Sequence, residues 1–166
     1  MKYHHGWTLI ELLVTLSIIS LLIGFGIPTL NQSLQRSTEK IAFTMLQRLS
    51  YYARTKAIRH NNYFTLCPSN DQVHCGGTWN QALIIFSDQN KNEIVDGSDE
   101  LFRTFTFGPN TPCIRWNRKR RQYLQFKPSG ASNGTAGHFA FCDPVNTTVE
   151  NKVVVSFNGR TSLKSL

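Results

Sequence analysis

Positive charge is concentrated in one stretch of the sequence, where side chains that bind phosphate are interleaved with aromatic residues. The segment from Leu101 to Cys142 contains seven Lys or Arg residues and no Asp or Glu. Six of the seven are Arg115, Arg118, Lys119, Arg120, Arg121 and Lys127. A cluster of this density tends to bind phosphates, and Trp116 and Tyr123 could stack on nucleic-acid bases. The alternative is a solvated hairpin tip or a surface that packs against an acidic neighbouring protein, and the net charge of +8 is compatible with both.

A second segment carries oxygen ligands in a spacing similar to that of a calcium loop. Asp88, Asn90 and Asn92 take the first, third and fifth positions of such a loop, which suits a hard cation. However, Glu93 stands where an EF-hand needs Gly, and Asp99 rather than Glu takes the twelfth position. We therefore expect residues 88–100 to form a solvated loop held by local Asx-turns, with calcium binding as the alternative.

Two further patterns imitate catalytic or metal sites without the full chemistry. The string GASNG places Ser132 in a Gly-x-Ser-x-Gly elbow, but a hydrolase also needs a His after its acid, and no His follows Asp143. His74 beside Cys75 raises the question of zinc, yet the sequence has no Cys-x-x-Cys pair and its five His lack metal-ligand spacing. We expect neither an enzyme nor a metal or other cofactor.

The four cysteines predict disulfide bonds. All of them follow the apolar N-terminal stretch, and an even number in a small domain outside the cytoplasm indicates two bridges. Four cysteines allow three pairings. We predict Cys67–Cys75, which closes a short loop between turn elements, and Cys113–Cys142, which ties the root of the basic segment to the run HFAFC.

The chain that positions these groups begins with an apolar helix. From Trp7 to Ile27 there are 21 residues, and Glu11 is the only formal charge among them. A helix of that length covers about 30 Å, the hydrocarbon thickness of a bilayer. A carboxylate there costs roughly 2.5–3.5 kcal/mol, so it usually marks a function and implies a partner. The alternative is a carboxylate that reaches the membrane interface from one end of the span.

The remaining sequence predicts an amphipathic helix followed by a β-rich domain. Residues 28–60 carry a stripe expected to pack on a sheet; it consists of Leu30, Leu34, Ile41, Met45, Leu49 and Tyr52. The turn formers His60-Asn61-Asn62 end this helix. Apolar or alternating runs then predict six strands, at 63–67, 82–86, 101–107, 123–128, 138–142 and 152–157. One long helix followed by six or more antiparallel strands indicates the α+β class.

The N-terminus resembles the class III leader of type IV pilins and pseudopilins. The leader MKYHHG is short and basic, ends in Gly6, and precedes an apolar helix with Glu at its fifth residue. In that family a prepilin peptidase cuts after the Gly and methylates the new amino terminus, which implies cleavage between Gly6 and Trp7. The resemblance also implies a partner for Glu11, namely the amino terminus of a neighbouring pilin in a filament. Trp7 stands where the family usually has Phe.

The rest of the chain looks like the FimT/GspH group of minor pilins. The resemblance rests on the order and spacing of YYARTKAIRHNNYFTLCPSNDQVHC, IIFSDQNKNEIVDGSDELFR, YLQFKPSGASNG, HFAFC and KVVVSFNGR. It implies a pilin-like fold, divided into a cleaved leader at 1–6, a transmembrane and filament-core helix at 7–27, an amphipathic helix at 28–60 and a β-rich head at 61–166. It also implies a bacterial inner-membrane protein with its head in the periplasm, later carried in a filament.

The resemblance leaves two machines open, because the group serves at or near the tip of type IV pili and in type II secretion pseudopili. DNA-binding members carry Gly-Arg-x-Arg after the last strand. This chain has Gly159 and Arg160, then Ser162 in place of the second Arg, with Lys164 two residues further on. The resemblance thus implies DNA as a partner of Arg160 and Lys164, and the basic segment predicts the same partner independently of it. Because Lys and Arg on loops contact phosphates, we expect binding without sequence specificity. The alternatives are a secretion pseudopilin without a DNA role and a structural subunit that primes assembly.

Overall fold

The computed structural model describes residues 8–118, 120–142 and 151–165; of these, the side chains at 25–32, 35, 36, 151 and 165 are not described. The chain divides into two units, Met1–Ser37 and Thr38–Leu166. The expected leader at 1–6, the cleavage-site residue Trp7 and the basic residue Lys119 lie outside the described residues.

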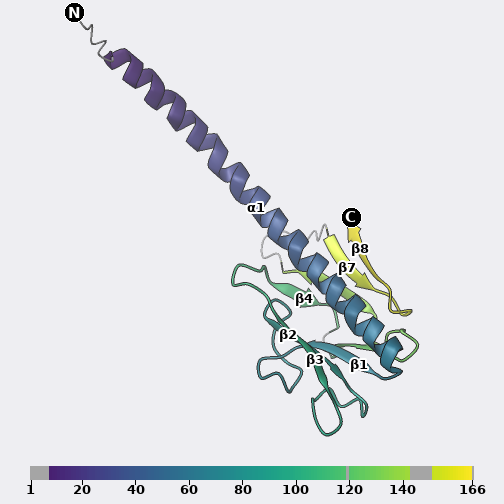
Figure 1. Cartoon of the computed structure of the whole chain (residues 1–166). Coiled ribbons are helices and arrows are strands. Elements are labelled where there is room, and N and C mark those ends of the chain that lie inside the picture. Colours follow the sequence, from purple (N-terminus) through teal and green to yellow (C-terminus); the bar gives the residue numbers. More distant parts are fainter. Residues whose placement is uncertain (1–7, 119, 143–150, 166) are drawn as a thin grey trace, which may run out of the picture. The chain divides into compact units, whose positions relative to one another are not determined.

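Helix α1 (Leu9–His60; Figure 1) begins after Thr8, whose side chain caps its first turn. The backbone N–H of Glu11 donates to the hydroxyl of Thr8 at 3.4 Å, and the pattern Thr-x-x-Glu puts a carboxylate in the first turn. A carboxylate at that position also interacts favourably with the positive end of the helix dipole. Glu11 therefore has a structural role at the start of the helix, separate from the assembly role that the sequence suggests.

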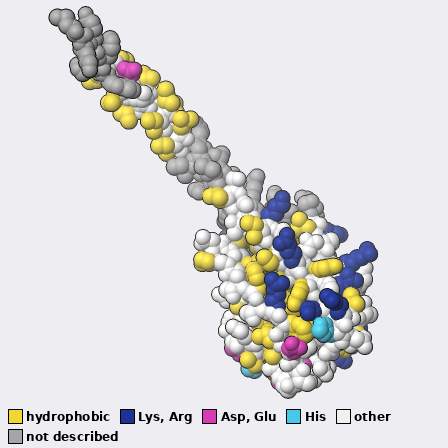
Figure 2. Space-filling model, in the orientation of Figure 1, with side chains coloured by type: hydrophobic (Ala, Val, Ile, Leu, Met, Phe, Trp, Pro, Cys, Tyr) yellow, Lys and Arg dark blue, Asp and Glu magenta, His cyan; other side chains and the backbone are white. Residues whose placement is uncertain are grey.

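In the first unit, the helix exposes apolar side chains all round. The large apolar side chains between Leu9 and Ile23 are 50–78 % exposed (Figure 2). A helix that is apolar on every side is normally buried in an apolar environment. This surface therefore needs covering by other molecules.

Within the described residues, no helix is both long enough and apolar enough to span a membrane.

The C-terminal end of α1 is fixed by a Schellman motif. Asn61 takes a positive φ of 48°, and its N–H donates to the carbonyl of Ile58 at 3.4 Å. The N–H of Asn62 donates to the carbonyl of Ala57 at 3.2 Å. These two bonds satisfy carbonyls that the helix leaves without partners, so the expected helix end at 60–62 is confirmed.

The second unit contains two four-stranded antiparallel sheets, and its eight strands confirm the expected α+β class. The strands are β1 (Phe64–Pro68), β2 (Ala82–Ser87), β3 (Leu101–Thr106), β4 (Ile114–Trp116), β5 (Leu124–Phe126), β6 (Gly137–Phe141), β7 (Asn151–Val155) and β8 (Thr161–Ser165). The first sheet has the order β3-β2-β1-β5 and the second β4-β6-β7-β8. The sequence had predicted six of these strands; β4 and β8 are additional.

The part of α1 in the second unit packs on the sheets through a stripe of small and large residues. The stripe follows the helical spacing of four, three, four and four residues, at Ala42, Leu46, Leu49, Ala53 and Ala57, all at most 2 % exposed. Small side chains in this stripe allow the helix backbone to lie close to the sheets. The buried residues therefore differ from those of the stripe predicted from the sequence.

The predicted stripe is wrong at two positions, because Leu34 and Ile41 are each 64 % exposed. Leu30 lies outside the described side chains. Met45 and Tyr52 are half-buried at the edge of the core. The prediction selected large apolar residues and passed over the alanines, which here mark the line of closest approach.

Strands β1, β2 and β5 of the first sheet are covered on both faces, whereas the edge strand β3 is largely exposed. One face contributes Phe64, Leu66, Leu83 and Ile85 to the main core under α1. On the other face, Cys67, Ile84 and Phe86 are buried beneath three half-buried residues of the connecting loops, namely Cys75, Val95 and Tyr123. The Cys67–Cys75 disulfide ties one of these loops to β1.

The structure contains the two expected disulfides. The second, Cys113–Cys142, lies at the second sheet, where it joins the residue before β4 to the residue after β6. The N–H of Cys142 donates to the carbonyl of Cys113 at 2.9 Å, continuing the pairing of β4 with β6.

The acidic segment forms a loop with internal hydrogen bonds. Fully buried Asp88 accepts bonds from the Thr65 hydroxyl and the Gln125 amide, both at 2.8 Å, so its carboxylate serves the interior of the first sheet. Asn92 makes an Asx-type contact with the N–H of Ile94 at 3.0 Å, as the loop prediction expected. In the described part of the chain, no three His, Cys, Asp or Glu side chains gather as a metal site requires.

Candidate nucleic-acid interface

Strand register brings three cations from distant parts of the sequence into one row on the second sheet. Arg115 pairs with Ala140, Ala140 with Lys152, and Lys152 with Lys164. Directly paired residues of an antiparallel sheet lie on the same face, and neighbouring strands are about 4.8 Å apart. We call Arg115, Lys152 and Lys164 the cationic row. It crosses all four strands, from β4 to β8.

The cationic row lies on the face of the second sheet that points away from the core. The residues that alternate with the row face inward and are buried: Ile114, Trp116, Phe139, Val153 and Val155. Arg115 and Lys164 are exposed and Lys152 is half-buried. We call this side of β4, β6, β7 and β8 the outer face.

The row places like charges together without nearby acids in the described chain. Lys152 and Lys164 are direct cross-strand partners, an arrangement that destabilises a sheet. Residues 101–142 and 151–165 contain no Asp or Glu; Asp143 and Glu150 belong to the 143–150 connection, outside the described residues. A surface of like charges attracts salt ions or an anionic partner.

His138 occupies the outer face beside the row. It pairs with Val154, two residues along the sheet from the Ala140–Lys152 pair. Burial lowers the pKa of His138, and the charges of Lys152 and Arg115 lower it further. His138 is therefore neutral at pH 7 and takes a proton only when the medium is more acidic or an anion is near.

Arg160 adds a cation to the same face at the β7–β8 hairpin. The N–H of Ser156 donates to the carbonyl of Arg160 at 2.9 Å, which continues the ladder by one pair beyond Val155 and Thr161. By alternation Arg160, Ser162 and Lys164 share the outer face. The Gly159-Arg160 pattern thus places its exposed arginine on the same face as the cationic row.

The local backbone structure explains why position 159 is a glycine. Its φ is +75°, and a Cβ on it would overlap the carbonyl oxygen of Gly130. Arg54 donates to that same carbonyl at 2.9 Å. Only glycine fits here, because the position combines a left-handed backbone with close backbone contact.

The remaining basic residues of the 115–127 segment divide between sites. Arg118 donates from Nε to the carbonyl of Ala136 at 2.7 Å, and Arg121 donates from Nη1 to the carbonyl of Gly134 at 3.2 Å. These two arginines therefore hold the segment before β6, and Arg120 is exposed between them. Lys127 follows β5 of the first sheet, where its carbonyl accepts from the N–H of Gly130 at 2.8 Å.

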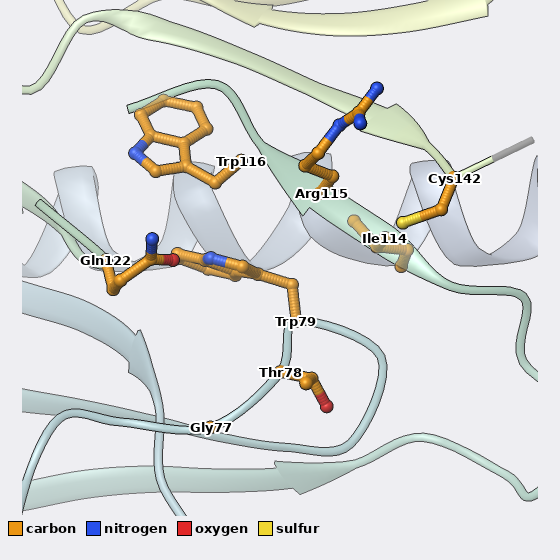
Figure 3. A pocket seen from close by; sticks show the side chains of 8 residues that line it. All are labelled: Gly77, Thr78, Trp79, Ile114, Arg115, Trp116, Gln122 and Cys142. Carbon is orange, nitrogen blue, oxygen red and sulfur yellow. The ribbon is translucent and has the colours of Figure 1, made fainter. Parts of the chain in front are cut away.

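The expectation that Trp116 stacks on bases is wrong. Trp116 is 3 % exposed and packs on Phe139 with ring centroids 4.5 Å apart. Figure 3 shows its ring above that of Trp79, beside a cavity of about 270 Å³ that Gln122 also lines. Tyr123 is half-buried, and burial together with the Glu93 hydrogen bond raises its pKa to about 12. Both aromatic rings serve packing.

Sequence reasoning missed Lys152 and His138. Neither lies in the basic segment or the Gly-Arg pattern, and only the register of β6, β7 and β8 brings them to the other cations. The sequence did contain a signal for Lys152. It opens the run KVVVSF, and strand alternation predicts that its side chain lies on the opposite face of the sheet from that of Val153.

Comparison with known proteins agrees with this architecture. A family model described as type II transport protein GspH matches residues 44–159, and a model of the prokaryotic N-terminal methylation motif matches residues 1–27. The chain is 28% identical over 170 residues to the pilin-like protein PilA1 of Thermus thermophilus, covering 96% of this chain and 97% of that protein.

Two crystal structures of the type IV minor pilin FimU from Pseudomonas aeruginosa share the fold. Their TM-scores are 0.58 and 0.61 at 20% and 21% identity, over 75% and 78% of this chain and 91% and 90% of theirs. The resemblance seen in the sequence is thereby confirmed. Because the GspH model matches more than half of the residues, the chain belongs to the GspH family and is a minor pilin or pseudopilin.

Proposed function

We propose that this chain is a minor subunit at or near the tip of a type IV pilus, and that its head binds DNA through phosphates on the outer face. The observation that carries the DNA part is the cationic row, in which Lys152 and Lys164 are paired directly. A row of like charges with no acid beside it among the described residues gains from an anionic partner what it loses by self-repulsion. Arg160 extends the positive surface along β8.

Binding of this kind reads charge and not sequence. Lys and Arg on strands and hairpins contact phosphates, whereas base-edge readout requires an element that enters a groove. With Arg115, Lys152, Lys164 and Arg160 each neutralising one phosphate, log K should fall with log salt at a slope of about −3 to −4 on duplex. Micromolar affinity is expected, and several heads in a filament would add avidity.

The test is a salt titration of the full-length chain in a neutral detergent with a duplex of mixed sequence. Replacing Lys152 and Lys164 together by Ala should weaken binding roughly tenfold and make the salt slope shallower by about 2. The control pair, Lys40→Ala with Lys91→Ala, removes the same charge from exposed positions elsewhere in the head. Equal losses in both pairs would contradict a localised interface.

Two substitutions on β8 test the Gly-Arg pattern in the same assay. Arg160→Ala should weaken binding. Ser162→Arg should strengthen it, because Ser162 pairs with Val154 on the outer face between Arg160 and Lys164. Neutralising Arg118 and Arg121 is a poorer test, since both also hold backbone carbonyls.

Assembly is expected to follow the pilin route. We infer cleavage between Gly6 and Trp7 by a prepilin peptidase, methylation of the new terminus, and an inner-membrane and filament-core helix at 7–27. Glu11 then meets the amino terminus of a neighbouring pilin. Glu11→Ala should leave the protein in the membrane fraction but poorly incorporated into filaments. Mass spectrometry that found filament protein beginning at Met1 would overturn this route.

A second function rests on the family model, whose description is a type II transport protein. In that case the chain is a minor subunit of a secretion pseudopilus and has no DNA role. Deletion of the gene distinguishes the two: loss of DNA uptake with secretion intact supports the pilus, and loss of secretion of folded proteins supports the pseudopilus.

A further inference from the structure

We propose that Phe157 is a stacking platform for an unpaired base, and that it gives the head a preference for single-stranded over duplex DNA. This inference rests on the proposed DNA function and adds the class of DNA to it. Phe157 lies in the loop of the β7–β8 hairpin and is 72 % exposed. The other described Phe side chains of the head are buried or half-buried.

The backbone that carries Phe157 is held firmly. Its carbonyl accepts hydrogen bonds from the N–H of Ser132 at 3.0 Å and from the Ser132 hydroxyl at 3.3 Å. Two residues on, Gly159 lies against the carbonyl of Gly130. The loop is thus attached to the 130–132 turn at two points while the ring remains in solvent. A ring on a fixed backbone loses little entropy when a ligand stacks on it.

The cations that would hold the accompanying phosphates belong to the same hairpin as Phe157. Arg160 closes the same hairpin loop, because its carbonyl accepts from the N–H of Ser156 at 2.9 Å. Beyond it on the outer face lies Lys164, in register with Lys152. A single strand can therefore place a base on Phe157, the adjoining phosphate on Arg160 and the following phosphates along the cationic row.

An exposed aromatic ring distinguishes single strands from duplex. In a duplex each base face is covered by its neighbours, whereas in a single strand the faces are open to side chains. Stacking on aromatic side chains is tolerant of sequence, since every base has a π-face. The cationic row would bind either form, but only the single strand would use Phe157.

A lone exposed apolar residue is common on protein surfaces, and a neighbouring filament subunit could also cover it. The chemistry separates the two occupants. An apolar contact with a protein tolerates Leu, which keeps the hydrophobic area. Stacking on a base requires the flat ring, which Trp keeps and Leu lacks.

The experiment compares Phe157→Leu and Phe157→Trp with the wild-type full-length chain in a neutral detergent, using an oligothymidine strand and a duplex at equal salt. Phe157→Leu should weaken single-strand binding by about 5-fold to 100-fold and leave duplex binding within twofold. Phe157→Trp should retain or improve single-strand binding. The matched control is Tyr51→Leu, which removes another ring that is 64 % exposed, on α1, and should change neither.

Three results would overturn the inference while the proposed function stands: single-strand binding unchanged in Phe157→Leu, equal losses on both forms of DNA, or normal DNA binding with filament incorporation lost. The last result would assign Phe157 to a subunit contact. Binding of neither DNA by the wild type would overturn the proposed function itself.

Discussion

The two sheets of the head differ in how their faces are covered. In the first sheet, β1 and β5 are buried throughout and β2 nearly so, because α1 covers one face and loops cover the other. In the second sheet, inward residues are buried and outward residues carry charge, as β4 shows with Ile114 and Trp116 buried on either side of exposed Arg115. The first sheet stabilises the head, and the second leaves a face open for a partner.

The treatment of charge shows the same difference. The first sheet buries one carboxylate, Asp88, and surrounds it with the Thr65 hydroxyl and the Gln125 amide. Arg103 and Lys56 at its edge lie over aromatic rings, 5.4 Å and 4.7 Å from the centroids of Tyr52 and Phe102. The cationic row has no comparable partner among the described residues. The charges of the first sheet are thus paired within the fold, whereas those of the cationic row have no such partner among the described residues.

Removing the disulfides should produce the largest effect, and it shows which sheet loses more stability without its bridge. The bridges span 29 residues for Cys113–Cys142 and 8 residues for Cys67–Cys75. On the chain-entropy model, replacing each pair by Ser should lower the free energy of unfolding by about 3.5 and about 2.5 kcal/mol, respectively. Urea unfolding at matched pH measures both. The reverse order would show that the loops covering the first sheet depend on their bridge more than closure entropy predicts.

Breaking the buried network of the first sheet should cost about as much as a disulfide. Asp88→Ala removes the buried acceptor of the Thr65 hydroxyl and one of the two acceptors of the Gln125 amide, so we expect a loss of about 3 kcal/mol. Asp96→Ala is the control, because Asp96 is exposed in the same loop and its carboxylate accepts from the side chains of Asn90 and Asn92. A loss of under about 1 kcal/mol for Asp88→Ala would mean that water replaces the carboxylate.

The contrast between the sheets also explains what the sequence could and could not predict. Strand β2 of the first sheet contains the continuous apolar run ALIIF, and residues 82–86 were recognised as a strand on that basis. β4 has three residues and β8 reads TSLKS, with a single apolar residue, so neither carries a signal of its own. They are strands because β6 and β7 offer them edges. Such pairing is a tertiary effect.

The site was predictable in composition but not in arrangement. Arg115, Arg160 and Lys164 were named from charge and from the Gly-Arg pattern, yet what joins them is Lys152, through the register of three strands. The opposite error occurred with Trp116. It lies between basic residues in sequence, but strand alternation turns it into the core.

Relieving the like-charge pair should affect stability little, and in the favourable direction. Lys152→Ala removes one charge directly opposite Lys164, so the free energy of unfolding should stay the same or rise by up to about 0.5 kcal/mol. DNA affinity should fall in the same variant. A loss of more than about 1 kcal/mol would show that Lys152 contributes packing to the fold, and it would blur the distinction between a stabilising sheet and a binding sheet.

The smallest effect concerns pH and belongs to the outer face alone. Because burial and the charges of Lys152 and Arg115 hold the pKa of His138 below its ordinary 6.5, the unfolded chain binds this proton more readily than the folded chain. The free energy of unfolding should therefore fall as pH drops below about 6.5. His138→Gln should flatten that part of the curve, and the exposed His74–Asp71 pair, 2.7 Å apart, acts equally in both proteins.

Phosphates on the face would stabilise the protonated ring, so DNA binding should strengthen over the same pH range in the wild type and less in His138→Gln. An identical pH dependence of stability and binding in the two proteins would place His138 outside the interface.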